Sequence, residues 1–297
     1  MNDSLAIALA RSADEEGDYP NILLEGDAGF GKTAIVKEWA KKNNINLVYK
    51  DAKTMNATDL GGMLARDPDN PRKSTRLGSV EFTRNLSKPR SVLFLDEFNR
   101  AKQEIRGSLL TLVQDHTVWD DEAEGEMLHI ENFLFTIAAV NPANSAYPGA
   151  KQLDPAERSR YRRIAVQPDP QAHLKFLTDF YTDKISKAQD DNSRLAYEGR
   201  LSLAKTILSS PDFYYDTSTE VEDSVDDNAY VPLNYRSFKM ALDASKGTKD
   251  SLLKVWSDYC NYNKKQLISD ILKNYVDVQD KANDVLKKHQ TKSSVFV

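Results

Sequence analysis

The chain has 297 residues, room for about two domains, and its 40% hydrophobic and 29% charged residues are typical of a globular protein. Its net charge of −5 argues against a dedicated nucleic-acid binder. The single cysteine, Cys260, excludes an internal disulfide, and the four histidines are too scattered for a zinc site.

No apolar run reaches the ~18–20 residues of a membrane helix. Met1–Ser4 does not start a secretory signal, because no basic region precedes an apolar core. We therefore expect a cytoplasmic protein without a membrane segment.

Strands and helices are predicted to alternate up to about residue 166. Apolar runs predict strands over residues 21–24, 46–49, 91–95, 133–140 and 164–166. Helical patterns fall at residues 33–42, at 80–86 and around 105–113. This alternation predicts an α/β fold in which a parallel sheet is sandwiched by helices.

Pro168-Asp169-Pro170 predicts a domain boundary, because two prolines this close cannot lie inside a helix. We expect an α/β nucleotide-binding domain over residues 1–167 and a smaller, all-α lid domain over residues 168–297. Within the lid, an acidic segment at about 212–228 is either a solvated loop between helices or a surface that docks a partner.

The first predicted strand leads into a run that matches the phosphate-binding pattern G-x-x-x-x-G-K-[ST], and a helical pattern follows it. Its backbone N–H groups and the helix N-terminus are expected to hold the phosphates of a nucleoside triphosphate. Within the run, Lys32 would reach the β- and γ-phosphates and Thr33 would bind Mg²⁺. The candidate nucleotide-binding residues are Gly26, Asp27, Ala28, Gly29, Phe30, Gly31, Lys32, Thr33 and Ala34.

The strand at residues 91–95 ends in two carboxylates, Asp96 and Glu97. We expect Asp96 to bind Mg²⁺ and Glu97 to act as the general base on the attacking water. An adjacent pair of this kind favours hydrolysis over transfer to a small molecule.

Further polar residues follow later strands. Asn141 directly follows the strand at 133–140, where it would orient the water or contact the γ-phosphate. Asn141-Pro142 is also a turn signal.

Arg236 opens a helix of the lid and is a candidate to reach the nucleotide. Planar guanidinium groups suit phosphate oxygens. If a cluster of arginines near residue 160 faces a neighbouring subunit, one of them could stabilise the transition-state charge in trans. A solvated basic face and nucleic-acid contact are the alternatives. The cluster consists of Arg158, Arg160, Arg162 and Arg163.

Taken together, these segments resemble the AAA+ ATPases, and within them the MoxR-like branch, closest to the midasin/dynein-related and CbbQ/NorQ-like members. The resemblance covers roughly residues 1–250. It rests on Asp96-Glu97-Phe98-Asn99-Arg100-Ala101, Ala139-Val140-Asn141-Pro142, Tyr147-Pro148-Gly149, Leu153-Asp154-Pro155-Ala156 and Ser159-Arg160-Tyr161.

The resemblance implies that Asn141 is sensor 1, that Arg160 is the arginine finger with Arg158 in reserve, and that Arg236 is the sensor 2 arginine, acting in cis or in trans. The chain departs from the family pattern at Tyr161, where Phe is usual. It departs again over residues 60–78, where the branch inserts a hairpin and this sequence is polar with two prolines.

The resemblance further implies a Mg²⁺-dependent ATP hydrolase that forms a ring, a hexamer, and remodels or activates a partner protein in a chaperone-like manner. Such a partner often carries a von Willebrand A domain. A nucleic-acid-translocating motor of the McrB or helicase-loader type is the first alternative, and the acidic balance weighs against it. A nucleotide-gated assembly scaffold and a monomeric nucleoside kinase are the others, and Glu97 and Arg160 weigh against both. Nothing in the chain resembles the guanine-reading pattern Asn-Lys-x-Asp.

Overall fold

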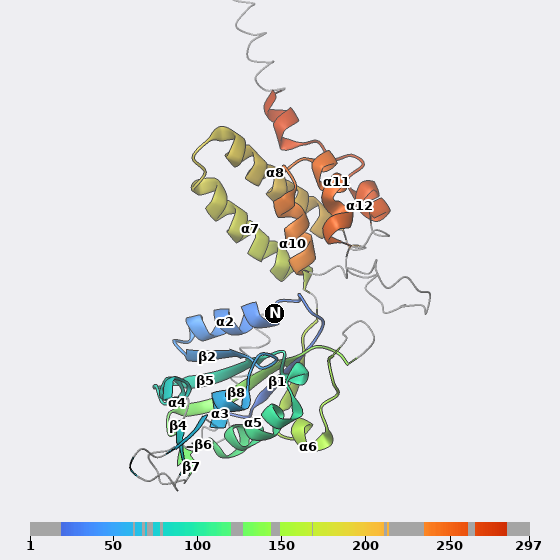
Figure 1. The fold of residues 1–297 in the computed structure, drawn as a ribbon. Helices are drawn as coiled ribbons and strands as arrows, with labels where there is room; N and C mark the ends of the chain where they lie inside the picture. The colour runs from blue at the N-terminus through green and yellow to red at the C-terminus, as the bar shows by residue number, and fades with distance from the viewer. Residues whose placement is uncertain are drawn as a thin grey trace, which may run out of the picture. The chain divides into compact units, whose positions relative to one another are not determined.

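Two units, Met1–Gln167 and Pro168–Val297, make up the chain in a computed structural model (Figure 1). The structure describes residues 19–61, 63–66, 69, 74–77, 80–119, 127–143, 149–167, 169–210, 213, 235–260 and 265–283. Pro168, Tyr147, Pro148 and, apart from Phe213, the acidic segment at about 212–228 lie outside these residues.

The first unit contains a five-stranded sheet with the strand order β2-β5-β8-β1-β9, in which all neighbours are parallel. The sheet and the helices around it confirm the predicted α/β fold. The strands are β1 (Ile22–Glu25), β2 (Asn46–Asp51), β5 (Ser91–Asp96), β8 (Phe133–Val140) and β9 (Arg162–Ala165), and the main connecting helices are α2 (Lys32–Lys42), α4 (Val80–Leu86) and α5 (Gln103–Asp115).

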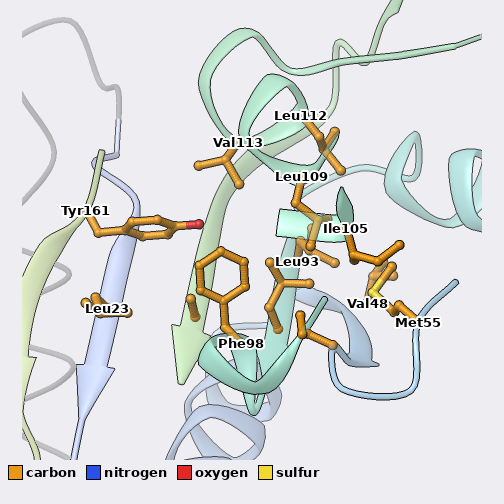
Figure 2. Close-up of a cluster of buried hydrophobic side chains, with 14 of the residues drawn as sticks. Leu23, Val48, Met55, Leu93, Phe98, Ile105, Leu109, Leu112, Val113 and Tyr161 are labelled. Atoms are coloured by element: carbon orange, nitrogen blue, oxygen red, sulfur yellow. The ribbon is translucent and has the colours of Figure 1, made fainter. Parts of the chain in front are cut away.

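Alternate strand residues supply two separate cores, one on each face of the sheet. Leu23 and Leu93 belong to a cluster with residues of α4 and α5, whereas Leu24 and Phe94 pack with residues of α2. Figure 2 shows Leu93 beside Ile105 and Leu109 of α5. Because both faces are covered, the central strands are apolar throughout rather than alternating. Strand β9 lies at the edge of the sheet and begins with two exposed arginines, Arg162 and Arg163. Because these two residues are not apolar, the apolar run at 164–166 did not predict them as part of the strand.

Two small antiparallel hairpins extend the first unit, and hydrophobic periodicity predicts neither. Strand β3 (Met63–Arg66) follows a short helix α3 (Ala57–Gly61) and pairs with β4 (Ser74–Leu77). Strand β6 (Thr117–Trp119) pairs with β7 (Met127–His129). The first hairpin occupies the polar stretch with two prolines, so the chain does have a hairpin there despite its composition.

The second unit is helical, in accordance with the predicted fold class. Its helices α7 (Pro170–Ser186), α8 (Asp191–Leu208), α10 (Tyr235–Ala244), α11 (Lys249–Tyr259) and α12 (Lys265–Ile271) enclose one core that includes Tyr181, Phe238 and Trp256. Cys260 packs into this core and is 1% exposed. Within the described residues, no helix has the length and apolar character needed to cross a membrane.

Candidate nucleotide site

The loop between β1 and α2 takes a shape that depends on its glycines. Gly29 and Gly31 have φ angles of 84° and 82°, in the left-handed region that favours glycine. A Cβ atom on Gly26 would lie 2.5 Å from the carbonyl oxygen of Val166, so only glycine fits beside the chain that leaves β9. Phe30, 5% exposed, anchors the loop in the core beneath α2. The N-terminus of α2 follows directly, and its positive dipole end favours an anion.

Lys32 connects this loop to the end of β8. Its buried ammonium group donates hydrogen bonds to the carbonyl oxygens of Gly26 (2.5 Å) and Asp27 (2.9 Å) and to Oδ1 of Asn141 (2.9 Å). An ammonium group has three protons, and these acceptors can take all of them. The charge is therefore held at the loop by polar oxygens, the kind of partner that phosphate oxygens can replace.

Thr33 and Asp96 lie next to each other at the same edge of the sheet. The Thr33 hydroxyl donates to Oδ2 of Asp96 over 2.7 Å, and Oδ1 of Asp96 accepts the backbone N–H of Glu97 over 3.0 Å. Mg²⁺ prefers oxygen ligands and combines one or two protein groups with water and phosphate oxygens. The Thr33 hydroxyl beside the Asp96 carboxylate fits such an ion. Among the described residues, no group of three His, Cys, Asp or Glu residues is arranged to hold a metal ion.

Glu97 adopts a left-handed backbone conformation, with φ 51° and ψ 36°. For a residue other than glycine this conformation costs roughly 1–2 kcal/mol, and such strain is concentrated at functional sites. Its carboxylate lies 3.3 Å from the Arg100 guanidinium and 3.7 Å from the Lys53 ammonium. Glu97 thus stands at the carboxyl end of β5, beside Asp96 and partly exposed.

Asn141 lies between the other site residues, because β8 runs between β5 and β1 in the sheet. It is 6% exposed and accepts the hydrogen bond from Lys32. The Asn141 side chain therefore contacts the phosphate-binding loop. This contact is additional to any turn that Asn141-Pro142 forms. The structure brings together Lys32, Thr33, Asp96, Glu97 and Asn141 at the carboxyl ends of parallel strands, where open α/β sheets bind ligands.

Arg160 lies near the amino ends of the strands, on the opposite side of the sheet from these residues. We call the side where the strands end the carboxyl edge and the side where they begin the amino edge. Arg162, two residues later, pairs with Ile22 at the start of β1, whereas the phosphate-binding loop follows the end of β1. Its side chain donates to Oε1 of Gln114 (2.9 Å), near the C-terminal end of α5, and to the carbonyl oxygen of Ala156. The structure therefore separates Arg160 from the site residues at the carboxyl ends of the strands in its own chain.

The remaining arginines of the cluster are also placed. Arg158 ends the short helix α6 (Pro155–Arg158) and is exposed. Arg162 and Arg163 belong to β9, where Arg163 forms an ion pair with Glu25. Arg236 is exposed on α10 of the helical unit.

A buried ion pair that the sequence gave no reason to single out holds α6 in place. Arg106 of α5 and Glu157 of α6 are 2.7 Å apart, with side chains 7% and 4% exposed. Glu157 also closes a capping box with Asp154 at the start of α6. The spacing of Asp154 and Glu157 is a sequence signal for that cap. Nothing in the sequence indicates the pairing with Arg106.

Comparison with known proteins finds one matching domain family. Residues 21–161 match the family described as the AAA domain of the dynein-related subfamily. This range includes the phosphate-binding loop, Asp96, Glu97, Asn141 and Arg160. No curated protein matches the chain.

Among solved structures, the chain is similar to NtrX from Brucella abortus in complex with ADP. The two share 13% identity over 96% of this chain and 67% of that chain, with a TM-score of 0.43. The AAA match and the parallel sheet together support an ATP-driven AAA+ protein with an α/β P-loop NTPase fold.

Proposed function

We propose, from the match of residues 21–161 to the AAA domain, that this protein is a Mg²⁺-dependent ATP hydrolase of the MoxR-like type. It acts as a ring oligomer, a hexamer, and couples ATP hydrolysis to the remodelling or activation of a partner protein. The observation that supports this best is the pair of contacts from the phosphate-binding loop: Lys32 to Asn141 over 2.9 Å and Thr33 to Asp96 over 2.7 Å.

Each residue of the carboxyl edge has a part in this proposal. Residues 26–34 bind the phosphates, and Lys32 exchanges its protein acceptors for β- and γ-phosphate oxygens. Thr33 and Asp96 would hold Mg²⁺, which would neutralise phosphate charge. Glu97 accepts the proton from the water that attacks the γ-phosphorus, and Asn141 orients that water.

Arg160 is proposed to act on the nucleotide of a neighbouring subunit. From Ile22 to Glu25 strand β1 advances by about 10 Å at ~3.3 Å per residue, and Arg160 lies beyond its amino end. The side chain is also directed to Gln114 on α5, away from the phosphate-binding loop of its own chain. A ring would bring it to the next subunit's γ-phosphate.

The helical unit completes the proposal. We propose that residues 168–297 form a lid. Arg236 of this lid contacts the nucleotide of its own or a neighbouring subunit. Hydrolysis would change the lid's position and drive the work on the partner. The partner class we propose is a protein with a von Willebrand A domain, and the compartment is the cytoplasm.

The experiment that tests the proposal measures ATPase rate against protein concentration, with the assembly state followed by mass, in the presence and absence of DNA. A specific activity that rises as rings form is the expected result. Additional stimulation by DNA would favour the nucleic-acid motor. A constant rate from a species that stays monomeric would overturn the shared site.

A further inference from the structure

Asn99 is buried beside the nucleotide site although it has no part in the chemistry proposed above. It is 2% exposed and lies in the 3-10 turn η1 (Phe98–Arg100), two residues after Glu97. Its Nδ2 donates to the carbonyl oxygens of Asn141 (2.8 Å) and Lys151 (3.2 Å). Its Oδ1 accepts the backbone N–H of Asn141 (3.4 Å). Both protons of the amide are thus used, and the two carbonyl partners fix which end of the amide carries them.

The two segments that Asn99 joins have different places in the proposed reaction. Asn141 is the residue that receives the hydrogen bond of Lys32. Lys151, whose backbone N–H donates to the carbonyl oxygen of Asn99 over 3.1 Å, begins the segment that leads to Arg160. That segment is itself anchored, by Glu157 on Arg106.

We infer that Asn99 is a positioning residue that couples Asn141 of one nucleotide site to the segment carrying Arg160, the residue which that subunit presents to its neighbour. The inference rests on the proposed function for the roles of Asn141 and Arg160. It makes Asn99 the point at which occupancy of one site is communicated to the next.

The physical reason is the cost of leaving a buried polar group without its hydrogen bond. When Lys32 turns to a phosphate, the Asn141 side chain loses its donor and the end of β8 is released from that contact. Any movement of the Asn141 backbone must then break its bonds to Asn99 or carry Asn99 along. Asn99 also donates to the Lys151 carbonyl. If Asn99 moves together with Asn141, it therefore shifts the segment that ends at Arg160.

A first test replaces only the donor. Asn99→Asp keeps the size of the side chain and the acceptor for the Asn141 N–H, but it presents a carboxylate oxygen to two carbonyl groups. We expect kcat of the ring to fall by about 5- to 150-fold, the range of a coupling free energy between sites, with Kd for nucleotide unchanged. The matched control is Asn46→Asp. Asn46 donates from Nδ2 to the Asn85 carbonyl and to Ser91 Oγ, both over 2.7 Å, at the start of β2, so its loss should leave kcat unchanged.

The decisive test uses rings of mixed subunits. Glu97→Gln subunits cannot hydrolyse ATP but present an intact Arg160, and Arg160→Ala subunits hydrolyse only beside such a neighbour. Their mixture should therefore recover activity that neither has alone. Asn99→Asp is then added to the Glu97→Gln subunit only, whose own site is already silent. The recovered rate should fall by about the same 5- to 150-fold.

Each other outcome overturns the inference in a different way. A recovered rate that the added Asn99→Asp leaves unchanged would confine Asn99 to its own site. An equal loss of kcat in Asn46→Asp would show a general structural effect. If the mixture lacking any change at Asn99 recovers nothing, the shared active site of the proposed function is itself wrong, and the coupling falls with it.

Discussion

The two edges of the central sheet differ in how their polar side chains are held. At the carboxyl edge Lys32, Thr33, Asp96 and Asn141 are joined by hydrogen bonds of 2.7 to 2.9 Å within one chain. At the amino edge Arg160 is held by exposed contacts to Gln114 and to the Ala156 carbonyl. The first arrangement is held by hydrogen bonds between buried or partly buried groups of one chain, while the second gives up only exposed hydrogen bonds when the arginine turns to a neighbour.

This difference separates binding from turnover. In the proposed function a single chain can bind nucleotide, because the loop, the helix N-terminus and the proposed Mg²⁺ ligands Thr33 and Asp96 come from the carboxyl edge. In the proposed mechanism the arginine finger at its γ-phosphate comes from a neighbouring subunit, since its own Arg160 belongs to the amino edge. Variants at one edge should therefore change affinity or chemistry in every subunit, and variants at the other should change turnover only in the ring.

Arg160→Ala should show the largest effect. An arginine finger contributes about 10³–10⁵ to the rate, so the turnover of assembled rings should fall by that range. Nucleotide affinity of the isolated chain should stay the same, as measured by equilibrium titration. Arg158→Ala is the matched control, because it removes an exposed arginine two residues away. A loss of turnover in Arg158→Ala with normal turnover in Arg160→Ala would move the finger to the reserve position.

Glu97→Gln tests the carboxyl edge. Loss of a general base should lower kcat by about 10²–10⁴ while ATP binding is retained, because the amide keeps the shape but cannot take the proton. Single-turnover rates and nucleotide titration separate the two quantities. Glu104→Gln, an exposed carboxylate in the first turn of α5, should behave like the wild type. Normal turnover in Glu97→Gln would remove the assignment of the base.

Glu157→Gln examines what holds the amino edge in place. The change leaves the Arg106 guanidinium buried without its counter-charge, which should cost about 3–5 kcal/mol of the unfolding free energy of the first unit. Chemical denaturation of the full chain measures this loss. Glu38→Gln breaks an exposed pair with Lys42, 2.9 Å apart, and should cost about 0–1 kcal/mol. Equal losses in the two variants would mean that the pair with Arg106 contributes no more than a surface contact.

The sequence predicted the carboxyl edge better than the amino edge for a physical reason. The phosphate-binding loop and the pair Asp96-Glu97 lie at fixed positions after apolar strands, so local pattern indicates both their type and their place. The contacts of Arg160, Glu157 and Asn99 join residues far apart in the chain, and no local spacing encodes them. The hairpin of β3 and β4 was missed for a related reason, since strands of four residues are too short to show a hydrophobic period.

Tyr161 offers the smallest and most specific test at the amino edge. The residue follows Arg160, is 7% exposed, and packs its ring against Phe98 at a centroid distance of 5.9 Å (Figure 2). Among the described residues its hydroxyl has no hydrogen-bond partner, and burial raises the pKa of the phenol well above its usual value. Tyr161→Phe should therefore raise the unfolding free energy of the first unit by about 1 kcal/mol, because it removes a buried polar group that is not satisfied.

Tyr181→Phe is the control, because the Tyr181 hydroxyl donates to Asp243 over 2.8 Å in the helical unit. That variant should lose about 1 kcal/mol where Tyr161→Phe gains it, and the opposite signs exclude a general effect of removing a phenol oxygen. Turnover of Tyr161→Phe rings should remain normal, since the ring packed on Phe98 and the contacts of Arg160 with Gln114 and Ala156 are unchanged. Reduced turnover at normal stability would mean that the hydroxyl, which this chain carries where the family usually has none, takes part in placing the finger.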